Sequence, residues 1–526
     1  TTAWNALRDA RVAELDAMPT IDSLAMPRFK FVNLFSNLIL TYLVNPNGGL
    51  FYTDKAFVYV PDSIMPMVVT PHLLPPGMIA AQRDGLNVIA AQQYGAPVYD
   101  TYGRKLDTGT WTSLPSWYTG NLPDIVHFGP DGSRFYRENY SDAYVTAEFL
   151  NSLRHLYQVT GDLAYAQSHQ SAVNAAVSGL KAFDAGYDSQ YGEDGNLFPN
   201  LLTPMGDLGR IAGEYPGETA QTIYAYEDAA ALMRLYGQTA QADQLIANYV
   251  TPMRVAFDTR FWNDSLSFYL PMADRNSQTR AVGTFYQDRW AHAVFVPLRG
   301  SLGQNRLAQM LAVLTGPDFY EPGNDVHWLA KGSENFATPG RWGLPTAYTN
   351  GWGMEGGYLV LPNVMAPLGY YQLAQVTQAE QYANIYFDKW VQYGPHEAMM
   401  EYQGQMPGQF GESSLYIEAA SGTTWLLQTA LGLEVDSTQI TITPKLSGQF
   451  VVRNLNITAQ GLTAVVSYAR DAQGQETINV ISNQGLVICA PRAGLCSPST
   501  PTPTPTRTPP APPIHTCRAG RTGRRL

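Results

Sequence analysis

The stretch "SDAYVTAEFLNSLRHLYQVTGD" (residues 141–162) carries the start and stop signals of one complete helix. Ser141 is a suitable N-cap, apolar residues recur at the spacing of a helical face, and Gly161 ends the pattern. The residues that follow at once, "LAYAQSHQSAVNAAVSGLKAF" (163–183), repeat the same spacing. A helix, a short glycine-containing turn and a second helix therefore form a unit that can be sought in the rest of the chain.

The same alternation of paired helices and longer loops continues from about residue 130 to residue 432. Further helical patterns lie at 219–237, 240–262, 285–298, 305–315, 354–377, 379–394 and 414–432. With the apolar stretch "FVNLFSNLILTYLV" (31–44), the total is about ten to twelve helices. The pattern predicts a mainly α protein whose helix pairs close into an α/α toroid, with the long loops at one end.

The pattern changes after Gly432. Four stretches alternate apolar and polar residues between turn residues, as antiparallel strands do: 439–446, 448–460, 462–471 and 476–484. Residues 48–130 are rich in Pro, Gly and Tyr, and we expect strands and loops with some helix there. The predicted domains are an N-terminal region (1–130), a helical barrel (131–433), a C-terminal β module (434–496) and a disordered linker with a basic tail (497–526).

Composition narrows the class of protein. Hydrophobic residues make up 45% of the chain and charged residues 15%, as in ordinary globular proteins. The net charge is −11 and the folded part has no basic cluster, which argues against nucleic acid as a partner. No apolar run reaches the length that spans a membrane.

The end of the chain gives the best indication of location. "PSTPTPTPTRTPPAPP" (498–513) is a low-complexity Pro/Thr spacer of the kind that tethers extracellular domains, so we expect a secreted or cell-surface protein. In an exported protein, Cys489 and Cys496 could form a disulfide across a short loop. The sequence contains no dinucleotide fingerprint, phosphate-binding loop, zinc-protease motif or nucleophile elbow, and no set of residues with metal-ligand spacing. We therefore expect neither a cofactor nor a metal.

Acidic and basic residues collect on a glycine-rich stretch, "TPMGDLGRIAGEYPGE" (203–218), just ahead of the helical pattern at 219–237. Asp207, Arg210 and Glu218 lie where backbone can approach a ligand closely. An acid at the start of a helix can also serve only as a cap or as a partner of the helix dipole. Both interpretations stay open for each residue taken alone.

The order of these segments resembles the six-hairpin (α/α)6 glycoside hydrolases, which include trehalases, processing α-glucosidases, the glucosidase half of glycogen-debranching enzymes and α-L-rhamnosidases. "DGNLFPNLLTPMGD" (194–207) is similar to the stretch that carries the general acid in this superfamily, and the matching carboxylate is Asp207. "MMEYQGQMPGQFGESS" (399–414) resembles the E-x-Y segment whose glutamate is the general base, which maps onto Glu401. The resemblance implies an (α/α)6 toroid that acts on an oligosaccharide or polysaccharide.

The same resemblance implies a set of substrate contacts. The helix at 141–162 matches one that a sugar-contacting Asp begins, and "LPTAYTNGWGMEGGYLVLPN" (344–363) is like the loop that lines the sugar pocket. The candidates are Asp142, Arg210, Glu218, Gln221, Trp342, Tyr348, Asn350, Trp352, Tyr402 and Glu412. Asp142 is equally suited to capping its helix, the aromatic residues could belong to the core, and Glu412 is either an alternative base or a cap.

The chemistry follows from two carboxyl groups. A protonated acid donates to the departing glycosidic oxygen, and a carboxylate activates water. Carboxyl groups about 6.5–9.5 Å apart leave room for that water and invert the anomeric centre. We expect a secreted, inverting hydrolase of an α-linked glucosyl or rhamnosyl residue. The alternatives are a polysaccharide lyase with the same toroid and a catalytically inactive glycan-binding protein.

Overall fold

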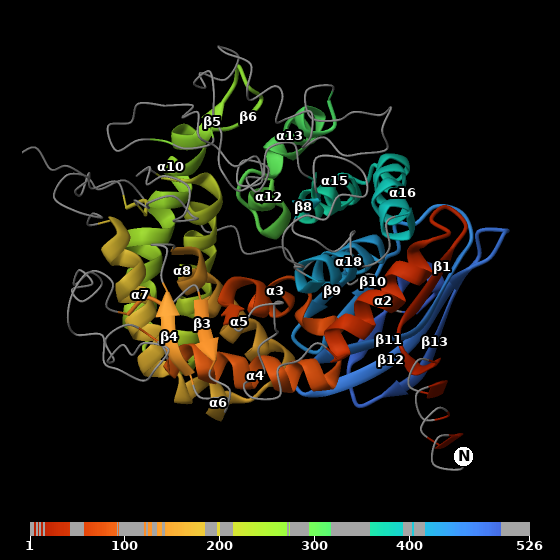
Figure 1. Ribbon diagram of the computed structural model, residues 1–526, viewed down its shortest axis with the longest axis horizontal. Helices are drawn as coiled ribbons and strands as arrows, with labels where there is room; N and C mark the ends of the chain where they lie inside the picture. Colours follow the sequence, from red (N-terminus) through yellow and green to blue (C-terminus); the bar gives the residue numbers. More distant parts are fainter. Residues whose placement is uncertain are drawn as a thin grey trace, which may run out of the picture.

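The computed structural model describes residues 5–6, 9, 12–13, 16–42, 57–91, 93, 120–122, 125–128, 134–138, 143–184, 197–199, 214–270, 273, 294–316, 358–392, 402–403 and 416–495. Within this part the protein is mostly helical, with a small β portion that is largely C-terminal (Figure 1). Among the described helices, none combines the length and the apolar character needed to cross a bilayer.

Six helices pack on one another in chain order, and the sixth returns to the first (Figure 1). We call them the central helices: α3 (Val60–Val69), α5 (Ala143–Thr160), α8 (Pro216–Leu235), α12 (Phe295–Arg299), α15 (Val360–Gln372) and α18 (Tyr416–Ala430). Each contacts the next, and α18 contacts α3. A closed series of contacts lets each of these six helices bury side chains against two neighbours.

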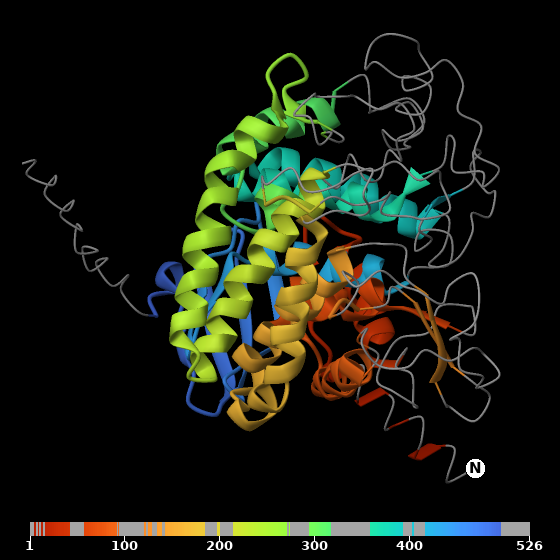
Figure 2. The same ribbon diagram turned by 90° about the vertical axis from the view of Figure 1, so that its left-hand side faces the viewer.

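A second set of helices alternates with the central helices along the chain and packs against them. These peripheral helices are α2 (Phe29–Tyr42), α4 (Pro76–Ala91), α7 (Gln170–Asp184), α10 (Thr251–Phe261), α13 (Leu307–Leu314) and α16 (Val376–Gln392). Figure 2 shows α5, α7, α8 and α10, coloured orange to green, standing side by side. Shorter pieces complete the helical part: η1 (Pro71–Leu73), α6 (Leu163–Ser168), α9 (Thr239–Leu245), a π-helical turn (Ile246–Val250) and η4 (Gln304–Arg306).

The helix predicted at 141–162 is confirmed as α5, and its predicted N-cap, Ser141, lies outside the described residues. It ends where predicted, because Gly161 adopts a φ of +66°, which glycine tolerates and other residues avoid. The carboxylate of Asp162 then accepts a 2.9 Å hydrogen bond from the backbone N–H of Tyr165 and caps α6. The second predicted helix, 163–183, is in two pieces, α6 and α7, with His169 between them.

The C-terminal β module consists of two sheets. One has the order β1–β11–β12–β13, and the other has the order β14–β10–β9. Their strands are β1 (Thr20–Ser23), β9 (Leu433–Asp436), β10 (Gln439–Ile442), β11 (Phe450–Ala459), β12 (Leu462–Arg470), β13 (Glu476–Asn483) and β14 (Val487–Cys489). The four predicted C-terminal strands are confirmed as β10 to β13. Figure 1 shows β1, in red, beside the blue strands, because it pairs antiparallel with β11 from Thr20↔Arg453 to Ser23↔Phe450.

Three small sheets accompany the helices. One has the order β2 (Phe57–Tyr59), β3 (Ile125–Phe128), β4 (Arg134–Glu138), and two-stranded pairs join β5 (Trp262–Asn263) to β6 (Phe268–Tyr269) and β7 (Tyr358–Leu359) to β8 (Tyr402–Gln403). Within 48–130, where we expected strands and loops with some helix, α3 and α4 occupy much of the described chain. The internal prolines of this stretch hid α3, since Pro66 lies inside the helix.

The connections on the two sides of the central helices differ in length. Segments that follow a central helix are short: 70–75 after α3, 161–162 after α5, 236–238 after α8 and 373–375 after α15. Segments that lead into a central helix are long, such as 185–215 before α8 and 393–415 before α18. The predicted acid and base belong to these two long segments by sequence.

Candidate functional site

The structure describes part of the predicted site. Glu218 and Gln221 are described with their side chains, and Tyr402 is described as a residue of β8. The remaining predicted residues lie outside the described residues: Asp142, Asp207, Arg210, Trp342, Tyr348, Asn350, Trp352, Glu401 and Glu412. Their assigned roles therefore stay predictions.

The start of α8 is the best-described part of the predicted site. Pro216 occupies the first helical position, where its missing N–H costs no hydrogen bond, and the N-cap residue Tyr215 makes no side-chain cap. Glu218 in the first turn and Gln221 in the second are both buried. The negative charge of Glu218 is favourable beside the positive end of the helix dipole. An acid that served only the dipole could remain exposed, so its burial indicates a further structural or binding role.

A chain of buried and half-buried polar side chains runs from Gln221 between three central helices. Gln221 Nε2 donates to Asn151 Oδ1 over 2.9 Å and to Glu148 Oε1 over 3.5 Å. Arg299 of α12 reaches both α5 residues over 3.4 Å, through Nη1 to Glu148 Oε1 and through Nη2 to Asn151 Oδ1. Asn151 Nδ2 in turn donates to Asp228 Oδ2 over 2.8 Å. We call these five residues the polar chain; it links α5, α8 and α12.

Burial sets the charge of two groups near the far end of the polar chain. Removal from water raises the pKa of Asp228 to about 7, and the hydrogen bond from Asn151 opposes that rise. Burial lowers the pKa of His155 to about 3, so this imidazole is neutral at pH 7. His155 Nδ1 donates to the carbonyl oxygen of Met67 over 3.1 Å, which fixes its tautomer.

The polar chain was missed in the sequence, although a signal is present. Glu148, Asn151 and His155 stand at i, i+3 and i+7 in α5, and Gln221 and Asp228 stand at i and i+7 in α8. Such spacing places polar groups on one face of each helix. Two polar stripes on helices that are otherwise buried indicate that the stripes face each other, because buried polar groups need partners.

A buried ion pair holds the backbone immediately ahead of α8. Arg260 Nε lies 2.5 Å from Glu214 Oε2, and the two side chains are 9% and 0% exposed. The backbone of Glu214 also bridges to Ala273, with N–H···O distances of 2.8 and 2.9 Å. At this distance the positive charge of the guanidinium cancels much of the electrostatic field of the carboxylate. Glu214 is therefore a poor source of the negative charge that would keep a neighbouring carboxylic acid protonated.

The short sheet β7–β8 locates the segment that follows residue 401. Leu359 pairs with Tyr402 and Tyr358 pairs with Gln403, in antiparallel register. Because β7 runs directly into α15, the backbone of residues 402–403 lies at the start of a central helix. The E-x-Y segment is thus tied at Tyr402 to the N-terminal end of α15.

A cavity of about 530 Å³ lies where the central helices end. Its walls include Val69 of α3, Arg299 of α12, Gln372 of α15 and Thr429 of α18, each in the last turn of its helix. These four helices therefore direct their C-terminal ends to one place. Their N-terminal ends, which the long segments lead into, lie on the other side.

No metal cluster occurs within the described ranges: no three His, Cys, Asp or Glu side chains stand close enough to hold one ion. Cys489 ends β14 in a buried position, and Cys496 lies outside the described residues, so the predicted disulfide stays a prediction.

Comparison with known proteins gives a likeness of fold. No family model matches the sequence, and no curated protein matches it. A GH78 family rhamnosidase of Bacillus sp. GL1 superimposes with a TM-score of 0.56 at 12% identity, over 90% of this chain and 42% of that chain. An α-L-rhamnosidase from Dictyoglumus thermophilum gives 0.52 at 11% identity, over 88% and 44%. A solved chain named as a sialidase gives 0.54 at 11% identity, over 88% and 40%.

The chain thus spans less than half the length of each of these three solved proteins. At such low identity the likeness concerns the fold. It confirms the predicted resemblance to six-hairpin glycosidases of the rhamnosidase kind at that level.

Proposed function

We propose that the protein is a secreted, inverting glycoside hydrolase that removes an α-linked rhamnosyl or glucosyl residue. The observation that carries the proposal is the series of six central helices, whose contacts return from α18 to α3 in a fold like that of solved rhamnosidases. This series supports closure of six helix pairs into an (α/α)6 toroid. The long segments that hold the predicted carboxylates lead into its central helices.

The reaction needs one acid and one base. Asp207, protonated, gives its proton to the glycosidic oxygen as the bond from that oxygen to the anomeric carbon breaks. Glu401 takes a proton from a water molecule whose oxygen attacks the opposite face of the same carbon. The sugar leaves as a hemiacetal of inverted configuration. The pairing of Tyr402 with Leu359 supports a position for this segment at the start of α15.

The polar chain gives Gln221 a defined part in this site. Its amide nitrogen already donates to Asn151 and Glu148, so a contact with sugar would use its carbonyl oxygen as the acceptor. The same bonds hold the first turns of α8 against α5. Gln221 therefore both offers one acceptor and fixes the turn that carries Glu218.

A secreted or cell-surface location is part of the proposal. Its support is the Pro/Thr-rich spacer at 498–513, whose composition cannot bury a core and suits a tether between extracellular parts.

The test is a panel of aryl α-glycosides and α-linked disaccharides, with the anomer of the first product followed by NMR. Asp207→Asn and Glu401→Gln should each reduce kcat/KM by about 10²–10⁴-fold, because each removes one proton-transfer group. Gln241→Leu, an exposed change on α9, is the matched control for folding and handling.

Full activity in either carboxylate variant would contradict the assignment. Release of the retained anomer would overturn the inverting mechanism. An unsaturated product, detected by ultraviolet absorbance, would favour the lyase instead, and binding without turnover would favour a glycan-binding protein.

A further inference from the structure

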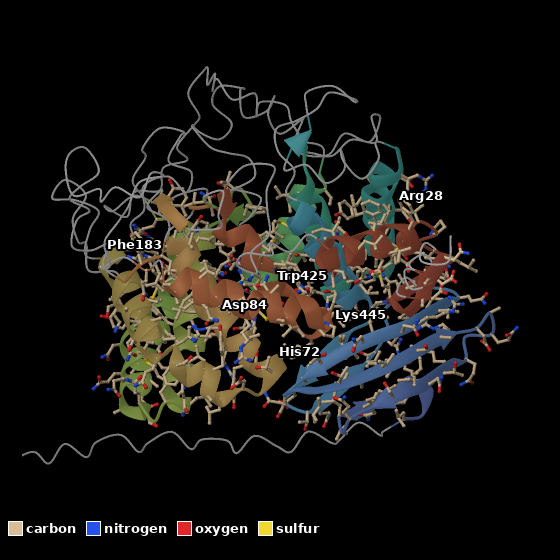
Figure 3. The ribbon with its side chains drawn as sticks, turned by 60° about the horizontal axis from the view of Figure 1, so that its bottom comes forward. Arg28, His72, Asp84, Phe183, Trp425 and Lys445 are labelled. Carbon is tan, nitrogen blue, oxygen red and sulfur yellow. The ribbon has the colours of Figure 1, made fainter. Side chains whose placement is uncertain are left out.

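The cavity at the ends of the central helices is lined by neither Glu218 nor Gln221, the two predicted site residues whose side chains are described. It is lined by the last turns of α3, α12, α15 and α18 and by the middle of α5 and α8. Lys445, after β10, adds a wall from the β module. Figure 3 labels Trp425 and Lys445 near each other where the helices meet the C-terminal strands.

Ionisable side chains of both signs line the cavity, and the raised pKa of Asp228 leaves this carboxyl partly neutral at pH 7. Three cationic side chains (Arg254, Arg299, Lys445) face three acidic ones (Glu227, Asp228, Glu434). Arg254 is committed to Glu227, with Nε 2.6 Å from Oε1 and Nη2 2.8 Å from Oε2. The converging C-terminal ends of helices carry partial negative charge, which disfavours an anion. The cavity therefore suits a ligand without net charge.

Several hydrogen-bonding groups on the walls lack a partner within the described part of the chain. The side-chain oxygens of Gln372 and Gln428 are buried and accept no hydrogen bond there. Gln372 Nε2 donates to the carbonyl oxygen of Leu298 over 2.9 Å, which fixes the direction of its amide. The ammonium group of Lys445 has no hydrogen bond or ion pair among the same residues, and burial lowers its pKa. The walls thus offer both acceptors and donors.

An aromatic side chain completes the lining. Trp425 lies in α18, with its ring stacked on Phe295 at 5.7 Å and 5° between planes, so its orientation is fixed. Trp425 is also one of the residues that line the cavity. A rigid aromatic group beside unpaired amide oxygens gives an apolar surface and polar groups in one small space.

We propose that this cavity is a second binding site, for a neutral sugar or polyol of monosaccharide size. A hydroxyl group both donates and accepts, so a polyhydroxylated ligand can bond the lysine ammonium and, once the side chain of Gln428 turns its shielded oxygen toward the cavity, that acceptor as well. The C–H face of the ring can pack on Trp425. A volume of about 530 Å³ is in the range of small-molecule sites, and its polar lining selects a hydrophilic occupant.

The site stands apart from the proposed hydrolysis, although the two are connected. Asn151 and Asp228 line the cavity and also belong to the polar chain that reaches Gln221. A ligand in the cavity would therefore contact the far end of a hydrogen-bonded path to the start of α8.

The test is calorimetric titration of the full chain carrying Asp207→Asn and Glu401→Gln, so that turnover does not obscure binding. The probes are L-rhamnose, D-glucose and myo-inositol, with D-glucuronate as the anionic comparison. Gln428→Leu removes one unpaired acceptor, and Lys445→Met removes the unpaired donor. Each should weaken binding of a neutral probe about tenfold, as expected for the loss of a buried hydrogen bond. Gln241→Leu is the matched control, and thermal melting checks the fold of every variant.

Saturable binding of a neutral probe that both cavity variants weaken and the control does not would support the site. Binding that neither cavity variant changes would place the probe elsewhere and overturn the proposal. So would the absence of saturable binding by any neutral probe, or a preference for D-glucuronate. Because catalysis is not measured, failure of the proposed hydrolysis would leave this result intact.

Discussion

The two ends of the central helices use polar side chains in opposite ways. Ahead of α8, Glu214 and Arg260 form a dry pair at 2.5 Å, with no room for a ligand between them. Where the helices end, Gln372, Gln428 and Lys445 stand around a hollow. The buried ion pair fixes the geometry of the backbone that carries it. The cavity groups without partners in the described residues would need hydrogen bonds from a bound molecule, as the proposed second site requires. The pair ahead of α8 thus fixes the backbone that leads into the proposed catalytic end, whereas the groups at the other end surround the cavity.

The largest expected effect on stability concerns the closed pair. Arg260→Leu leaves the carboxylate of Glu214 buried without this cation, so the free energy of unfolding should fall by about 3–5 kcal/mol. Urea denaturation followed by circular dichroism measures it. A fall below about 1 kcal/mol would show that the pair is not dry in solution and would remove the contrast between the two ends.

A pH-dependent effect should come from Asp228 at the other end. Its pKa is raised from 3.8 to about 7, so the folded state binds more protons than the unfolded state between these values. The contribution of Asp228 to the free energy of unfolding is fully present below pH 3.8 and is lost as pH rises through about 7. Asp228→Asn removes this loss, so the variant should gain on the wild type from pH 4 to 7, by at most about 1.4 kcal/mol per pH unit.

His155 has the opposite pH dependence, because its lowered pKa costs stability as pH falls from 6.5. The wild type and Asp228→Asn both retain His155, so its contribution cancels in the difference between their free energies of unfolding. A difference in unfolding free energy that stays constant with pH would mean that Asp228 is solvated and ionised.

A smaller loss is expected from the polar chain that joins the two ends. Asn151→Leu keeps the side-chain volume but removes the acceptor for Gln221 and the donor to Asp228. Buried groups left without this partner should lower the free energy of unfolding by about 1–3 kcal/mol. Guanidinium denaturation is a suitable measurement, and an unchanged midpoint would indicate that water replaces the amide.

The smallest effect is expected from an exposed pair at the end of α8. Arg234 Nη2 lies 2.8 Å from Asp243 Oδ1, and the two side chains are 45% and 64% exposed. Arg234→Leu should therefore change stability by only about 0.2–1 kcal/mol. If it cost as much as Arg260→Leu under identical conditions, burial would not be what distinguishes the two pairs.

Local signals in the sequence were enough for the helices and strands that carry them. Gly161 ends α5 as predicted, and strands β10 to β13 follow the alternation of apolar and polar residues. The break at His169 was missed, because apolar spacing continues on both sides of it. The helix α3 was hidden by its prolines, which disfavour a helix. Its packing against α5 on one side and α18 on the other outweighs that cost in free energy.

Long-range contacts were not predictable from one sequence. Nothing local in β1 indicates that Thr20 pairs with Arg453, and nothing local in α5 indicates that Asn151 meets both Gln221 and Asp228. The cavity likewise depends on where six helices end. The proposed acid and base, Asp207 and Glu401, remain predictions from resemblance, since both lie outside the described residues.

The pairing of β1 with β11 sets an order for the making of this protein. The ribosome completes β1, α2 and α3 hundreds of residues before residues 450–453, which pair with β1, and before α18, which packs on α2 and α3. Until then buried side chains such as Phe29, whose ring stacks on Phe387 of α16, lack part of their final packing and are open to aggregation. The first helices must therefore wait for the last strands, and a chaperone that shields them on the nascent chain would raise the yield of folded protein.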